Sequence, residues 1–113
     1  MTYPYIKNID YAKAVVLGDL VTVVPGQIVS RTLSQNDAVS ITLFAFSKGE
    51  EISTHESTGD AMVTALSGTG KLTIDGVDHI IKAGETVVMP ANTPHAVAAV
   101  DDFKMELVVV FPH

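Results

Sequence analysis

The sequence predicts a single all-β domain, a sandwich or barrel of eight or more short antiparallel strands. The first observation is that turn residues recur along the chain from Pro25-Gly26 onward, mostly four to ten residues apart. The second is that the intervening stretches are apolar and rich in β-branched residues, which is typical of strands. The third is that no stretch of ten or more residues has a convincing helical period. A length of 113 residues suits one domain with one core.

The turn residues divide the chain into eight predicted strands. Between residues 71–74 and 77–82, the pair Asp75-Gly76 predicts a tight hairpin. The predicted strands cover residues 27–33, 39–47, 61–67, 71–74, 77–82, 86–89, 96–100 and 104–111.

Alternation along the last strand predicts which side chains face the core. Lys104 and Glu106 alternate with Met105 and Leu107, so the odd-numbered residues are expected to point inward.

The strand at residues 39–47 indicates that one outer face of the domain is covered. It alternates at first and then becomes apolar on both sides at Phe44-Ala45-Phe46. Residues 1–24 are assigned to an N-terminal arm and residues 25–113 to the barrel. We expect a homodimer with the arm as a contact, because the covered face and the arm's apolar and aromatic residues would otherwise be exposed to water.

Composition excludes several classes of function. The net charge is −6, and the seven Lys and Arg residues are scattered, so no nucleic-acid binding is expected. No apolar run approaches the roughly 20 residues that cross a bilayer, and no signal peptide is evident, so we expect no membrane partner and a cytoplasmic location. The absence of cysteine excludes disulfides, thiolate metal sites and a Cys nucleophile.

Two glycine–histidine elements are the most informative motifs. In the first, Gly49 is followed by five residues and His55, and Gly68 closes the element. In the second, Gly84 and Pro90 precede His95. The segment between them contains the predicted Asp75-Gly76 hairpin.

This arrangement resembles the cupin superfamily, small barrels named for their double-stranded β-helix or jelly roll. The resemblance implies a single-domain barrel of the cupin 2 type, which often forms dimers and often holds a metal on three His and one Glu. The chain departs from the family pattern at four positions. In the first motif Ser57 replaces the second His and Ala61 replaces the Glu, and in the second motif Asn92 replaces a Gly and Ala99 replaces an Asn.

His55 and His95 occupy the slots that the family uses for metal ligands. We expect them within a few ångströms of each other, lining the main cavity and reaching it from strands of opposite sheets. They are the predicted ligands of a weakly held divalent metal, which could be zinc, nickel, manganese or iron. A third ligand could come from Asp60 or Glu56, although alternation points both side chains outward.

Other residues are candidates to shape the pocket. Ser57 takes an inward slot and could bind a ligand or a metal-bound water. Ala61 and Ala99 replace larger side chains and are expected to leave apolar volume. Met62, Met89 and Met105 are candidates to line or cap that volume, although methionine is more often core filler. No role is expected for His79, which should be exposed, or for the last residue, His113.

Two classes of function remain open. The first is a module that binds a small molecule in an apolar pocket with the two histidines as polar anchors. The second is a metal-dependent enzyme resembling the cupin oxygenases, isomerases or decarboxylases, in which His55 and His95 hold the metal. The missing carboxylate ligand favours the binding module, and fold alone does not choose between them.

Overall fold

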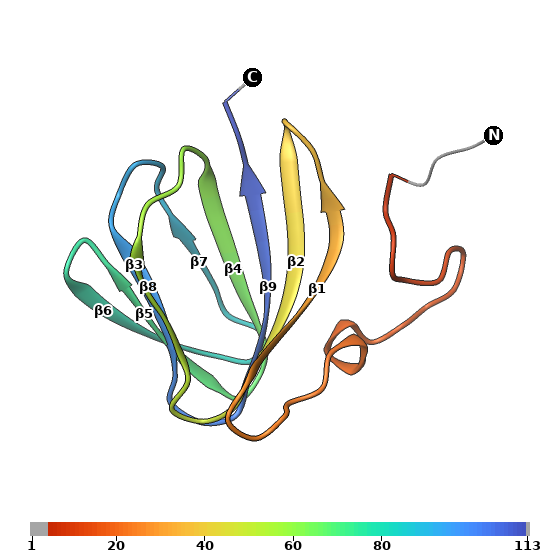
Figure 1. Cartoon of the computed structure of the whole chain (residues 1–113), viewed down its shortest axis with the longest axis horizontal. Coiled ribbons are helices and arrows are strands. Elements are labelled where there is room, and N and C mark those ends of the chain that lie inside the picture. The colour runs from red at the N-terminus through yellow and green to blue at the C-terminus, as the bar shows by residue number, and fades with distance from the viewer. Residues whose placement is uncertain (1–4, 113) are drawn as a thin grey trace.

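The computed structural model describes residues 5–112, which form an all-β jelly roll of two facing antiparallel sheets (Figure 1). Sheet A has five strands in the order β1-β2-β9-β4-β7, and sheet B has four in the order β3-β8-β5-β6. In sheet A the strands are β1 (Ile28–Gln35), β2 (Val39–Phe46), β9 (Phe103–Val110), β4 (Asp60–Ser67) and β7 (Thr86–Met89). In sheet B they are β3 (Glu51–His55), β8 (His95–Ala99), β5 (Thr69–Ile74) and β6 (Val77–Lys82).

All eight predicted strands are present, with bounds within two residues of the prediction. The structure adds β3, which the prediction lacked. This strand lies at an edge of sheet B, and of its five residues only Ile52 is partly shielded from solvent. An exposed edge strand needs little apolar patterning, which explains why its polar sequence gave no strand signal.

The hairpin between β5 and β6 is formed as predicted. Ile74 pairs with Val77, and the two residues between them, Asp75 and Gly76, have φ of 49° and 79°. Positive φ at both positions is the conformation of a type I′ turn, whose twist matches that of the strands it joins.

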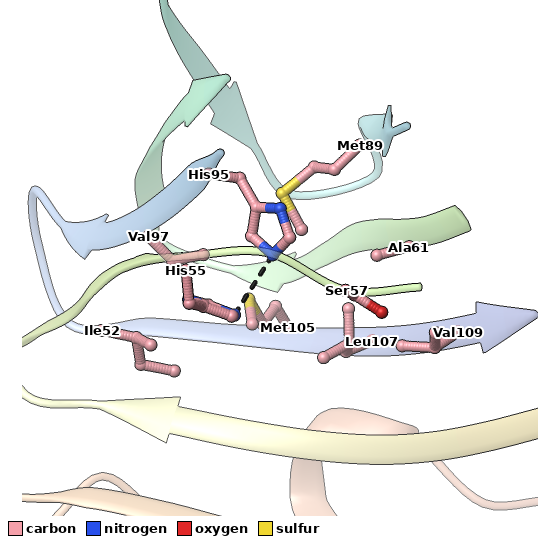
Figure 2. A pocket seen from close by; sticks show the side chains of 10 residues that line it. All are labelled: Ile52, His55, Ser57, Ala61, Met89, His95, Val97, Met105, Leu107 and Val109. Carbon is pink, nitrogen blue, oxygen red and sulfur yellow. Dashed lines mark hydrogen bonds between the residues drawn. The ribbon is translucent and has the colours of Figure 1, made fainter. Parts of the chain in front are cut away.

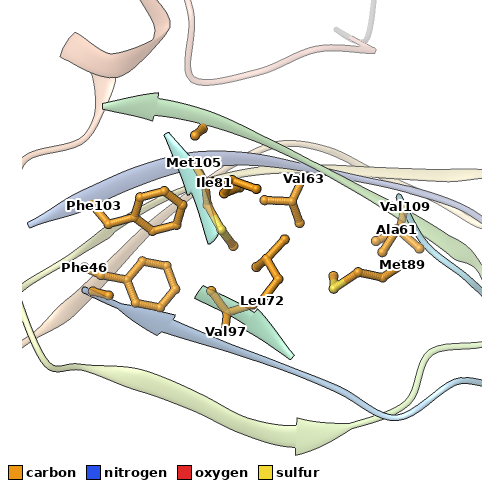
Figure 3. Packing of buried hydrophobic residues seen from close by; sticks show 12 residues of the cluster. Phe46, Ala61, Val63, Leu72, Ile81, Met89, Val97, Phe103, Met105 and Val109 are labelled. Carbon is orange, nitrogen blue, oxygen red and sulfur yellow. The ribbon is translucent and has the colours of Figure 1, made fainter. Parts of the chain in front are cut away.

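The main core lies between the two sheets (Figure 3). The inward side chains of β9 are its odd-numbered residues, and Phe103, Met105 and Val109 are buried there, as alternation predicted. Phe103 packs against Phe46 of β2, with ring centroids 5.9 Å apart. Residues from both sheets make up the cluster: Phe46, Ala61, Val63, Ala65, Met89, Phe103, Met105 and Val109 from sheet A, and Leu72, Ile81, Val97 and Ala99 from sheet B.

A second, smaller core covers the outer face of β1 and β2, which explains why β2 is apolar on both sides. Leu33, Leu43 and Ala45 are buried there against Val21 of the N-terminal segment. The segment runs beside β1 in Figure 1 and includes the short 3-10 helix η1 (Leu17–Leu20). The covering that the sequence indicated is therefore supplied by the same chain.

Hydrogen bonds fasten the N-terminal segment to sheet A. Arg31 donates to the Leu20 carbonyl at 2.9 Å, and Lys104 donates to the Gly18 carbonyl at 2.6 Å. The Lys7 amide donates to the Leu33 carbonyl at 2.8 Å, which pairs part of the edge of β1. Within residues 5–112, no helix is long and apolar enough to cross a membrane.

Candidate functional site

His55 and His95 lie side by side on adjacent strands of one sheet. They are direct register partners in the antiparallel pairing of β3 with β8. The expectation that they come from opposite sheets was therefore wrong. Its cause is that residues 51–55 carry no apolar strand pattern, so the pairing of β3 with β8 was not predicted. Cross-strand partners are the closest side chains on one face of a sheet.

The two imidazole rings meet edge to face and point one nitrogen at each other (Figure 2). Their centroids are 4.3 Å apart with an interplanar angle of 71°, and the two Nε2 atoms are 3.1 Å apart. Each Nδ1 faces a backbone carbonyl, that of Ser53 at 2.9 Å from His55 and that of Thr93 at 3.0 Å from His95. The backbone therefore fixes the orientation of both rings.

The two histidines differ in exposure. His95 is 3% exposed, whereas His55 is exposed at the edge of the sheet. Burial lowers the pKa of His95 below its ordinary value of 6.5, and the nearby His55 lowers it further. The hydrogen bond to the Thr93 carbonyl and the charge of Glu56 oppose this shift of the pKa. His95 thus sits in an environment that favours the neutral imidazole.

A cavity of about 260 Å³ opens beside the histidine pair. Its wall is almost entirely aliphatic, with the two imidazoles and Ser57 as the polar groups. Among the described residues that line it, none carries a carboxylate, an ammonium or a guanidinium group. The lining residues, drawn in Figure 2, are Ile52, His55, Ser57, Ala61, Met89, His95, Val97, Met105, Leu107 and Val109.

The structure brings some of the candidate pocket residues to this cavity and not others. Ser57 and Ala61 line it. Asp60 does not line it, since this exposed residue accepts a hydrogen bond from the Ala91 amide at 2.8 Å on the outer side. Ala99 is buried in the core between the sheets, away from the cavity wall, and Glu56 is exposed. Neither proposed third ligand therefore lies among the cavity-lining residues.

The three candidate methionines also separate. Met89 of β7 and Met105 of β9 line the cavity and are 2% and 1% exposed. Met62 of β4 is 40% exposed, and its register partners put it on the outer face of sheet A. Alternation could have made this distinction in advance, because Met62 lies between Ala61 and Val63, which are both inward.

Two hydrogen bonds hold Ser57 at the cavity mouth. Its hydroxyl accepts a hydrogen bond from the Gly59 amide at 3.1 Å, and its carbonyl accepts one from the Asn92 amide at 2.7 Å. Asn92 has a φ of 58°, in the left-handed region that glycine adopts most easily. This is the position where the resemblance predicted glycine, so the backbone conformation is retained although the residue differs.

Other histidines add nothing to the site. His79 is exposed on β6, as expected, and His113 lies outside the described residues. Over residues 5–112, no group of three or more His, Asp or Glu side chains gathers where it could hold a metal.

Comparison with known proteins identifies relatives along the whole chain. Residues 42–111 match the family described as the cupin domain. A conserved protein of unknown function from Streptococcus pyogenes is 47% identical, with a TM-score of 0.97 over 100% of this chain and 99% of that one. A cupin superfamily protein from Desulfitobacterium hafniense is 30% identical, with a TM-score of 0.90 over 95% of this chain and 98% of that one.

One curated relative has a named activity. The dimethylsulfoniopropionate lyase DddW of Ruegeria pomeroyi is 35% identical over 54 residues, which are 48% of this chain. The match spans 36% of the lyase. The likeness is therefore to a part of that protein.

Proposed function

The chain belongs to the cupin domain family, and from this premise we propose that it binds a small molecule in the barrel cavity, with His55 and His95 as the polar anchor and a weakly held metal cation between them. The observation that carries the proposal is the contact between the two Nε2 atoms at 3.1 Å.

Counting protons shows why this contact calls for a third partner. A backbone carbonyl only accepts hydrogen bonds, so each Nδ1, facing the carbonyl of Ser53 or Thr93, carries its ring's hydrogen. In two neutral rings both Nε2 atoms then present lone pairs to each other, which is repulsive at this distance. A proton or a metal cation between the nitrogens removes the repulsion. Burial lowers the pKa of His95 and so disfavours a proton on that ring near neutral pH.

The residues present fit a metal in two respects. Two imidazole nitrogens bound to one ion at about 2.0–2.1 Å are roughly 2.8–3.4 Å apart when they subtend about 90–110°, a range that includes the observed 3.1 Å. A metal-binding histidine also commonly donates its other ring hydrogen to a carbonyl, as both rings do here. His55 and His95 would hold the metal, which would polarise a polar group of the bound molecule.

The cavity wall indicates the chemistry of the ligand. About 260 Å³ lies just below the roughly 300–1,000 Å³ of pockets for drug-sized molecules, so the ligand is a small metabolite. The aliphatic side chains favour an apolar body, and Ser57 with the histidine pair favours one polar end. Without a lysine or arginine among the lining residues, a ligand carboxylate would depend on the cation for its counter-charge.

A second candidate is a metal-dependent enzyme built on the same two ligands. The partial likeness to a dimethylsulfoniopropionate lyase favours it. The test is to incubate the metal-loaded protein with dimethylsulfoniopropionate and to follow the compound by NMR. Its loss in the wild type and its survival with His55→Ala/His95→Ala protein would support the enzyme. If dimethylsulfoniopropionate bound to the protein and was not consumed, the result would support the binding module instead of the enzyme.

Isothermal titration calorimetry tests the metal anchor directly. The wild type is titrated with zinc, nickel, manganese and iron(II), alongside the double variant His55→Ala/His95→Ala and the control His79→Ala, whose histidine lies outside the cavity. We expect binding heats in the wild type and the control and none in the double variant. A chelator should strip these divalent ions readily, because the two histidines are their only strong protein ligands. Equal heats in all three proteins would reject the anchor.

A further inference from the structure

Two thioether sulfurs enter the same cavity as the histidine pair. Figure 2 shows the side chains of Met89 and Met105 reaching in from the sheet A side, with their sulfur ends directed toward the imidazoles. Met89 is on β7 and Met105 on β9, whereas His55 and His95 are on β3 and β8 of the facing sheet. The groups that line the cavity therefore include two imidazoles on one side and two thioethers on the other.

The charge of the cavity makes a monovalent cation less costly to hold than a divalent one. All four donor groups are neutral, and no carboxylate is among the described residues of the wall. A cation of charge two would enter a mostly aliphatic cavity without any negative group to balance it, and the cost of burying an unpaired charge rises steeply with that charge. A cation of charge one is much less costly to bury.

Donor softness points to the same choice. Zinc, manganese and iron(II) sites in proteins are built mainly from imidazole, carboxylate and thiolate groups, whereas thioethers select copper(I). We propose that the cation held in this cavity is copper(I), bound by His55, His95, Met89 and Met105. This inference rests on the proposed metal anchor and names the metal and two further ligands.

The competing explanation for the methionines is that they only fill the core. The chain provides a control for that explanation, because Met62 is on the outer face of sheet A and 40% exposed. The chain also lacks cysteine, so no thiol competes for copper(I) in a titration.

The test is a competition titration of the whole chain with copper(I) against bathocuproine disulfonate, without oxygen. Its proteins are the wild type, Met89→Leu/Met105→Leu, Met62→Leu and His55→Ala/His95→Ala. Losing the two thioethers should weaken copper(I) binding by about 100-fold, taking roughly tenfold for each ligand. Zinc binding, measured by calorimetry, should change by less than about threefold in the Met89→Leu/Met105→Leu protein, since thioethers contribute little to zinc sites. Met62→Leu should match the wild type for both metals.

A second measurement needs no variant. In selenomethionine-labelled wild-type protein loaded with copper(I), X-ray absorption at the selenium edge should show copper as a neighbour of selenium. This keeps the proposal testable if either leucine variant folds poorly, which circular dichroism would reveal.

The outcomes separate the two proposals. Unchanged copper(I) affinity in Met89→Leu/Met105→Leu, or labelled protein without copper beside selenium, would overturn the copper(I) site and leave a histidine anchor for another metal. Failure of the wild type to bind copper(I), zinc or any other tested metal more tightly than His55→Ala/His95→Ala would overturn the anchor and the copper(I) site together.

Discussion

Gly70 lies against the Phe103 ring with no room between them for a methyl group. A Cβ at residue 70 would be 2.5 Å from ring Cζ and 2.6 Å from Cε2. Gly70 belongs to β5 of sheet B and Phe103 to β9 of sheet A, so the contact sets how closely the sheets approach. It lies at the end of β5 away from Ile74, the register partner of His95.

Replacing Gly70 by alanine should therefore destabilise the barrel. The added methyl group overpacks a buried contact, and we expect the free energy of unfolding to fall by about 1–3 kcal/mol. Urea denaturation followed by circular dichroism measures this. Gly18→Ala is the matched control, since its Cβ would meet Leu66 at an ordinary 3.8 Å. A Gly70→Ala midpoint equal to that of the control would contradict the close approach.

Two alanines should respond oppositely to enlargement. Ala61 faces the cavity, so Ala61→Leu fills empty volume and should leave the free energy of unfolding unchanged or raise it by up to about 2 kcal/mol. Ala99 is packed in the core, so Ala99→Leu should lower it by about 1–3 kcal/mol. Xenon enters apolar cavities and so reports on the volume of the cavity that Ala61 faces. The NMR chemical shift of xenon should change on addition of wild-type protein and should change much less on addition of Ala61→Leu protein. Equal xenon responses would show that Ala61 does not face the cavity.

The free energy of unfolding should decrease as the pH falls, because His95 is protonated more easily in the unfolded chain than in the folded protein. Because burial lowers the pKa of His95 in the folded protein, the unfolded chain takes up its proton first as the pH drops below 6.5. The contribution of neutral His95 to the free energy of unfolding is complete above pH 6.5. It declines between pH 6.5 and the lowered pKa of His95, with a slope of at most about 1.4 kcal/mol per pH unit. Urea midpoints across this range should show the decline in the metal-free wild type and in His79→Gln. The decline in urea midpoint should be smaller in His95→Gln. If the midpoint of His95→Gln declined with the same slope as that of the wild type, the effect would belong to another group.

The left-handed residue Asn92 should tolerate glycine better than alanine. Its φ of 58° strains any residue with a Cβ, and asparagine bears this better than most. We expect Asn92→Ala to lower the free energy of unfolding by about 1 kcal/mol and Asn92→Gly to leave it unchanged or raise it. Thermal unfolding measures both. If alanine proved as stable as glycine, the loop must adopt another conformation.

A homodimer is predicted from the part of sheet A that the N-terminal segment leaves open. Val108, Met62 and Val88 are register partners across β9, β4 and β7, which aligns three apolar side chains in one row. Met62 is 40% and Val88 54% exposed. Light scattering at micromolar concentration should give twice the mass of one chain, and Val88→Lys should halve it. A wild type with the mass of one chain would reject the dimer.

The sequence predicted most of the fold because most strands carry their own signal. In β9, alternation of Lys104 and Glu106 with Met105 and Leu107 identified the buried face, and Asp75-Gly76 fixed the hairpin between β5 and β6. Strand β3 escaped because Glu51–His55 is polar and gains its order from pairing with β8, a long-range contact that no local pattern encodes.

The candidate site was predicted in its residues more than in its arrangement. The Gly–x5–His55 spacing and His95 identified the pair. The two rings were expected on opposite sheets, whereas they lie on adjacent strands of one sheet, because β3 was not predicted. Ser57 and Ala61 were identified from their motif slots, and Ala99, chosen in the same way, instead packs in the core. A motif position predicts whether a side chain points inward or outward. Whether an inward side chain lines the cavity or packs in the core depends on how the two sheets stack.

The central place of β9 in sheet A has a consequence for how the protein folds as it is made. This strand is the last in the sequence, yet it lies between β2 and β4 and pairs with both. Until residues 103–110 emerge from the ribosome, each of those strands has one edge without its native partner. Such edges are prone to pair with other chains. Closure of the barrel should therefore wait for residues 103–110 and depend on contacts between residues distant in sequence, which makes folding slow.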